Sequence, residues 1–70
     1  MAVKVREVSC ETNGKYKWEV TIPSGRAIMF CKKNRQRAGF LVVGILVGEG
    51  MGYDKARCKA TQMFIELKKD

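Results

Sequence analysis

A strict alternation of polar and apolar residues in the first third of the chain constrains the fold most strongly. In residues 15–22 every second side chain is apolar, namely Tyr16, Trp18, Val20 and Ile22, and the residues between them are polar. Successive side chains of a β-strand point to opposite faces of a sheet. The pattern therefore predicts a half-buried strand with one wet, partly basic face.

Turn signals on both sides of this strand predict two further strands. Residues 11–14 (ETNG) contain Asn-Gly, which tolerates the positive φ angles of a tight hairpin. The Val-rich residues 3–10 before it are expected to form a strand, with a bulge at Arg6-Glu7 where the alternation slips. Pro23-Ser24-Gly25 predicts a second turn and a returning strand over residues 26–32.

The second half of the chain predicts one more strand and a helix. Residues 40–47 (FLVVGILV) are apolar on both sides of a pleat, which is typical of a strand that is covered on both faces or flanked on both edges. Apolar residues then recur at helical spacing and predict a helix over residues 54–68, with Asp54 as its N-cap. The expected architecture is a single α+β domain over residues 1–70, with three or four antiparallel strands and one C-terminal helix packed on one face.

Size and composition limit the functions open to this chain. Its 70 residues accommodate one domain, whose apolar side chains are needed for one core. There is no histidine, and Cys10, Cys31 and Cys58 stand far apart without a CxxC pair, so neither a zinc site nor a disulfide scaffold is expected. No two carboxylates have a recognisable catalytic spacing. We expect no enzyme activity, catalytic residue, metal or cofactor.

Cysteine usage and hydropathy indicate the cellular compartment of the protein. Scattered, odd-numbered cysteines are typical of a reducing compartment. The first residues offer no secretory h-region. The longest apolar run, residues 40–48, is about half the length needed to cross a bilayer as a helix. The sequence thus predicts an intracellular protein, nuclear or cytoplasmic, with no membrane partner.

The charge balance points to polyanions. Fourteen Lys and Arg against seven Asp and Glu leave a net charge of +7, which attracts nucleic acid before other partners. The plain alternative is that this charge only keeps the protein soluble. Basic residues concentrate in a loop at residues 32–37 and in the first turns of the helix. If both groups converge, seven cations form one strip that holds phosphates without reading bases: Lys32, Lys33, Arg35, Arg37, Lys55, Arg57 and Lys59.

Three glycines, at positions 48, 50 and 52, separate the apolar run from the helix. A dinucleotide site would need a second parallel strand after the helix, and a P-loop would end in Gly-Lys-Ser/Thr, so nucleotide binding is not favoured. Read with the helix, the segment resembles the double-stranded RNA-binding domain. Gly48-Glu49-Gly50 stands where that family has a glycine pair, Ala56-Arg57 where it has Ala-Lys, Ala60-Thr61 where it has Ala-Ala, and residues 65–67 near its apolar end.

The resemblance implies a divergent member of that family that lacks the first helix, either a whole protein or a fragment of a Dicer-like or other RNA-processing protein. It implies a non-catalytic module that binds the sugar–phosphate backbone, with double-stranded RNA preferred and DNA also open. Gly52-Tyr53-Asp54 replaces the family's Ser-Lys-Lys, and the histidine of a family loop is missing.

Two alternatives follow from other residues. A protein-interaction domain or homodimer of the same fold, without RNA binding, is indicated by Asp54 and by the apolar Ile65 outside the core face. A small DNA-binding domain that lays its sheet in the major groove is compatible with Lys15 and Lys17 on the outer face. Trp18 is interpreted as a core residue in preference to a base-stacking platform.

Overall fold

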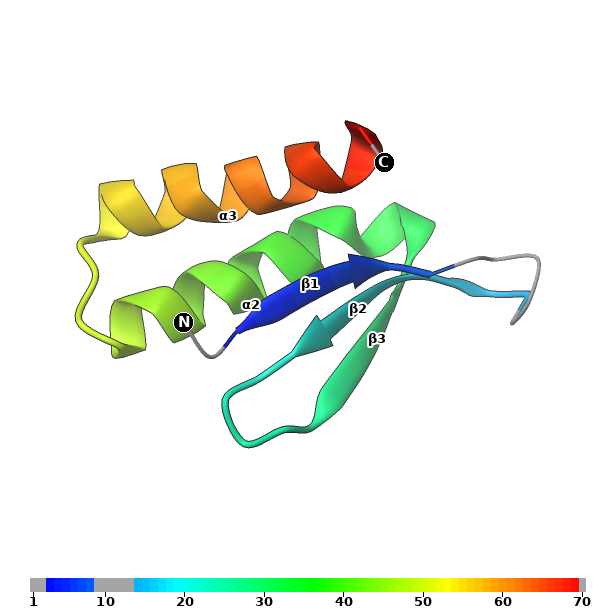
Figure 1. The fold of residues 1–70 in the computed structure, drawn as a ribbon, viewed down its shortest axis with the longest axis horizontal. Coiled ribbons are helices and arrows are strands. Elements are labelled where there is room, and N and C mark those ends of the chain that lie inside the picture. The colour runs from blue at the N-terminus through cyan, green and yellow to red at the C-terminus, as the bar shows by residue number, and fades with distance from the viewer. Residues whose placement is uncertain (1–2, 9–13, 70) are drawn as a thin grey trace.

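A computed structural model describes residues 3–8 and 14–69 of the chain. A three-stranded antiparallel sheet is followed by two helices, in the order β-β-β-α-α (Figure 1). The elements are β1 (Lys4–Glu7), β2 (Tyr16–Thr21), β3 (Ala27–Cys31), the short 3-10 helix η1 (Lys32–Asn34), α2 (Arg35–Gly48) and α3 (Tyr53–Lys69).

The three predicted strands are confirmed, and β2 is the central one. β1 pairs regularly from Lys4 to Glu7, so the bulge expected at Arg6-Glu7 is wrong, and the irregular register lies between Tyr16 and Trp18 of β2 instead. The second turn is confirmed as well. Ile22 donates its N–H to the Arg26 carbonyl at 2.9 Å, and Gly25 has the positive φ of 95° that favours glycine. Of the first turn, residues 11–13 lie outside the described part.

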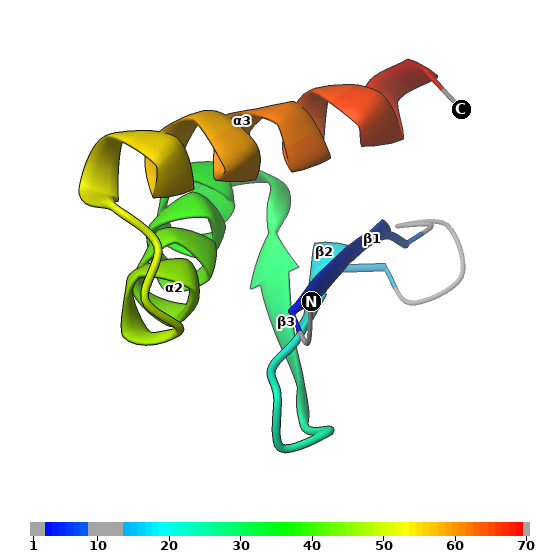
Figure 2. The same ribbon diagram turned by 60° about the vertical axis from the view of Figure 1, so that its left-hand side comes forward.

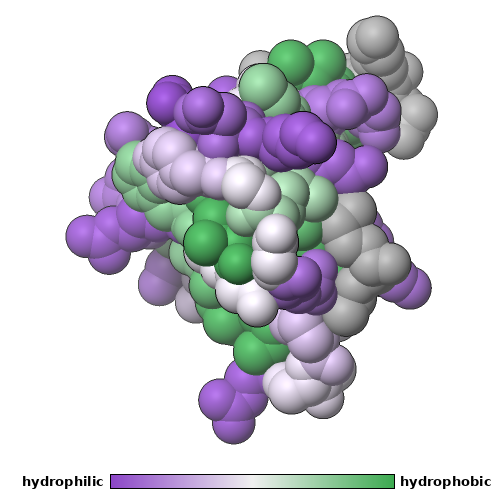
Figure 3. All heavy atoms as spheres, turned by 90° about the vertical axis from the view of Figure 1, so that its left-hand side faces the viewer, coloured by the Kyte–Doolittle hydropathy of each residue, from purple (hydrophilic) through white to green (hydrophobic). Residues whose placement is uncertain are grey.

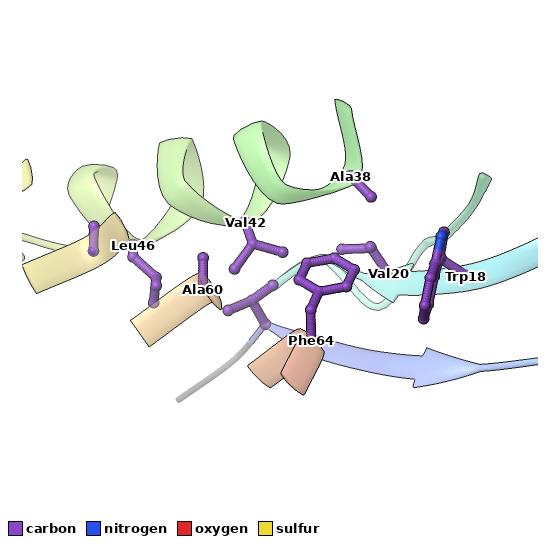
Figure 4. Packing of buried hydrophobic residues seen from close by; sticks show 9 residues of the cluster. Trp18, Val20, Ala38, Val42, Leu46, Ala60 and Phe64 are labelled. Carbon is purple, nitrogen blue, oxygen red and sulfur yellow. The ribbon is translucent and has the colours of Figure 1, made fainter. Parts of the chain in front are cut away.

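One face of the sheet and both helices form the core (Figure 4). Every fourth residue of each helix is buried, which matches the period of an α-helix. The rings of Trp18 and Phe64 meet edge to face with their centroids 5.5 Å apart. Trp18 is 3% exposed, so its assignment to the core is confirmed. The buried residues are Val3, Trp18, Val20, Ala38, Val42, Leu46, Ala56, Ala60 and Phe64.

Residues 40–47 lie in α2, so the predicted fourth strand is wrong, and the sheet is followed by two helices instead of one. A run that is apolar on every side shows neither the two-residue period of a strand nor the 3.6-residue period of a helix. Its conformation therefore depends on its contacts with the rest of the fold. Here α2 packs against β2, β3 and α3, and its Ala38, Val42 and Leu46 are buried in the common core. The opposite side of the helix stays in solvent, and Phe40 is 60% exposed.

The two helices run antiparallel on one side of the sheet (Figures 1 and 2). Residues 49–52 join them through a turn in which Gly50 has a φ of 102°, and Met51 donates its N–H to the Leu46 carbonyl at 3.1 Å. α3 begins one residue before the predicted start, so Asp54 lies in its first turn instead of at the N-cap. No helix in the described part of the chain combines the length and the apolar character needed to cross a membrane.

Candidate functional site

The seven cations predicted to form one strip are divided by the fold. Residues 32–37 lie where β3 runs into α2, and residues 55–59 lie in the first turns of α3. Because the two helices are antiparallel, these segments lie toward opposite ends of the long axis, which is horizontal in Figure 1. Of the seven, Arg35 and Arg57 line a common groove. Lys55 and Lys59 line a separate hollow on α3 together with Asp54.

The strand register brings a different set of cations together. Tyr16 pairs with Cys31, so the start of β2 lies beside the end of β3. Lys15 and Lys17 flank Tyr16, and η1 begins directly after Cys31. We call this cluster of six cations the basic end: Lys15, Lys17, Lys32, Lys33, Arg35 and Arg37.

Positive charge dominates at the basic end. Residues 32–48 contain four basic residues and no acidic one. Lys32, Lys33 and Arg37 are exposed, and the N-terminus of α2 adds the positive end of its dipole to their field. Glu7 forms an ion pair with Lys17, with 2.6 Å between its Oε1 and the lysine Nζ. The exposed cations of η1 and of the first turn of α2 therefore form a surface that attracts anions.

A groove of about 460 Å³ lies between α2 and α3. Apolar side chains from both helices make most of its wall, and Arg35 and Arg57 supply its charge. Gln36 and Thr61 add neutral polar groups, and none of the described residues that line the groove is acidic. The lining residues are Arg35, Gln36, Gly39, Phe40, Val43, Arg57, Ala60, Thr61 and Phe64.

Aromatic rings hold both arginines of the groove. The Arg35 guanidinium lies 5.6 Å from the centroid of the Phe64 ring, and that of Arg57 lies 5.8 Å from the Tyr53 ring. Such cation–π contacts fix a guanidinium without neutralising it. The Nε of Arg35 is buried and has no hydrogen-bond acceptor within the described residues.

Apolar surface is exposed on the helices as well. Phe40 and Val47 of α2 are 60% and 41% exposed, and Tyr53 and Ile65 of α3 are exposed by about half. Figure 3, seen from the end where α2 joins α3, shows hydrophobic atoms at the surface below the hydrophilic atoms of α3. Within the described residues, no three His, Cys, Asp or Glu side chains gather into a potential metal site. A surface that combines positive charge with exposed apolar side chains is suited to binding another molecule.

Sequence reasoning missed two parts of this arrangement. Lys15 and Lys17 were assigned only to the outer face of a strand, although the tight turn at Pro23-Ser24-Gly25 implies that the start of this strand lies beside the end of the next one. The groove was missed because its α2 wall, including Phe40 and Val43, was assigned to a strand. The exposed Ile65 outside the core face was anticipated.

The double-stranded RNA-binding resemblance depended on a strand before the glycine pair. In the structure Gly48-Glu49-Gly50 joins two helices, and the order of elements differs from the one that the resemblance implies. Comparisons with family models, with curated proteins and with solved structures give no match for this chain.

Proposed function

We propose that this protein is a non-catalytic nucleic-acid-binding module whose basic end holds the sugar–phosphate backbone of a duplex. One observation carries the proposal: Lys32, Lys33 and Arg37 are exposed together where β3 runs into α2, and residues 32–48 contain no acidic side chain. Lysine side chains bind phosphates as mobile point charges, so such a cluster positions a backbone without specifying a sequence.

The uncovered face of the sheet favours B-form DNA as the duplex. Both helices lie on the other face, and no described element covers the side that carries Lys4, Arg6 and Thr21 (Figure 2). Arg6 is paired with Glu19 at 3.1 Å on this side, so the face offers polar groups more than net charge. Sheets of this kind dock in the wide major groove of B-DNA, whereas the major groove of A-form RNA is too deep and narrow.

The salt dependence of binding tests the proposal. Each phosphate contact contributes about 0.9 to the slope of log K against log salt, so Lys32→Ala/Lys33→Ala should reduce the steepness by about 2. Lys55→Ala/Lys59→Ala is the matched control, because it removes the same charge from exposed positions of α3. The slope of log K against log salt for this control should stay within about 0.5 of the wild-type slope. Fluorescence anisotropy with a labelled DNA duplex at four salt concentrations measures both.

Equal slopes for the two double variants would refute the role of the basic end. Side-by-side titrations with an RNA duplex and a single strand of the same sequence test the choice of duplex. Tighter binding of the RNA duplex than of the DNA duplex would contradict the role of the sheet face. Absence of binding to all three would refute the function as a whole.

A further inference from the structure

Helix α2 exposes more apolar surface than a helix on the outside of a small domain ordinarily does. From Ala38 to Gly48 it has no polar side chain. Its buried stripe needs only one side of the helix, yet Phe40 and Val47 on another side are 60% and 41% exposed. A helix that is apolar all round is normally covered on every side. Exposed apolar patches of this kind mark interaction surfaces.

The groove beside this surface carries positive charge that nothing in the described chain neutralises. Arg35 and Arg57 both line it, no acidic residue does, and neither arginine forms an ion pair with a described carboxylate. Stacking on Phe64 and Tyr53 holds the two guanidinium groups in place before a ligand arrives. Preorganised groups lose little side-chain entropy on binding, which raises affinity for an anion.

The two arginines have a defined spacing. Arg35 lies over the Phe64 ring and Arg57 over the Tyr53 ring, and these two rings are eleven residues apart on α3. At a rise of 1.5 Å per residue, eleven residues span about 16 Å along the helix. A helix lying along the groove presents side chains at i and i+11 with this same spacing, and its residues i+4 and i+7 lie between them on the same face.

We propose that the groove between α2 and α3 binds an acidic amphipathic helix of a partner protein. Two carboxylates eleven residues apart pair with Arg35 and Arg57, and the apolar residues between them contact Phe40 and Val43. This is the helix-in-groove mode of recognition, with bidentate carboxylate–guanidinium pairs at both ends. The interaction goes beyond the proposed nucleic-acid binding and does not depend on it.

Charge complementarity favours this occupant over two others. A second copy of the chain carries +7 and would bring the same arginines toward each other in a symmetric dimer. A nucleic-acid backbone would satisfy the arginines, but it would leave the apolar wall of Phe40, Val43 and Ala60 without a matching surface. An acidic amphipathic helix matches both the charge and the apolar wall.

Two synthetic helical peptides test the proposal. One carries Glu at positions i and i+11 with Leu at i+4 and i+7, and the other differs only by Gln in place of both Glu. Anisotropy of the labelled peptides should show the Glu peptide binding about tenfold more tightly, as expected for charged pairs to guanidinium groups. Phe40→Ser should weaken both peptides.

Matched protein variants separate specific pairing from general charge. Arg57→Gln should remove most of the tenfold difference between the peptides. Lys59→Gln, which removes the same charge from the other flank of α3, should leave the difference within about twofold. Circular dichroism of each variant checks that the fold is kept.

Several results would overturn the proposal. Equal affinity for the two peptides, or equal effects of Arg57→Gln and Lys59→Gln, would show that the arginines do not pair with carboxylates. A dimer in sedimentation equilibrium that dissociates with Phe40→Ser would assign the surface to a second copy. If Arg57→Gln weakens a DNA duplex as strongly as it weakens the Glu peptide, the groove belongs to the nucleic-acid surface. Lys32→Ala/Lys33→Ala should weaken the duplex and spare the peptide, so each proposal can fail without the other.

Discussion

Replacing Gly44 by alanine tests directly whether the apolar run is a helix. Gly44 lies in the interior of α2, is exposed, and an added Cβ would meet nothing within 4 Å. In an exposed helix interior, alanine stabilises the folded protein by about 0.5–1 kcal/mol relative to glycine, because alanine loses less backbone freedom on folding than glycine does. Gly44→Ala should therefore raise the free energy of unfolding by that amount.

Gly50 provides the matched control. A Cβ at this position also meets nothing within 4 Å, but Gly50 has a φ of +102° in the turn between the helices. An L-residue in left-handed backbone costs about 1–2 kcal/mol. Gly50→Ala should therefore lower the stability although the added methyl group is the same. The difference between the two variants reports backbone conformation and not contacts.

Thermal unfolding followed by circular dichroism measures the effect. For a domain of this size, about 0.5–1 kcal/mol corresponds to a rise in Tm of about 2–8 °C for Gly44→Ala. Gly44→Val distinguishes helix from strand, because valine ranks below alanine in a helix and above it in a strand. Higher stability of the valine variant would refute the helical assignment, as would a Tm for Gly44→Ala below that of the wild type.

Two further predictions concern the core and the open face of the sheet. Phe64 is 3% exposed and its ring lies edge to face with Trp18, so Phe64→Ala should destabilise the protein by about 3–5 kcal/mol and Phe64→Leu by about 1 kcal/mol. Urea titrations monitored by tryptophan fluorescence measure both, and an unchanged stability of Phe64→Leu would contradict the edge-to-face contribution. Glu19→Gln breaks the surface ion pair with Arg6 and should lower the free energy of unfolding by less than about 1 kcal/mol. In 1 M salt the variant and the wild type should be equally stable. A loss of stability that persists in high salt would show that the pair is not simply electrostatic.

The elements with a clear local pattern were predicted well. The alternation around Trp18 and Val20 identified the central strand, and Pro23-Ser24-Gly25 identified the turn that follows it. The spacing of Ala56, Ala60 and Phe64 identified α3 to within a residue at each end. In the strand and in the helix one face is apolar and the other is polar, so the period of the pattern distinguishes the two conformations.

The candidate site was predicted only in part. The cations of residues 32–37 were found because they lie next to one another in the sequence. Their neighbours in space, Lys15 and Lys17, were not grouped with them, because strand register depends on turn geometry and on which face is buried. The groove was not predictable while Phe40 and Val43 were assigned to a strand.

Local spacing and composition specify a basic α+β chain with three antiparallel strands and an amphipathic C-terminal helix. Two further features depend on contacts between distant parts of the chain. Residues 40–47 carry apolar side chains on every side, and their helical conformation is settled by the packing of Ala38, Val42 and Leu46 in the core shared with the sheet and α3. The charges converge or separate according to strand register and helix direction, which depend on contacts between residues far apart in the chain.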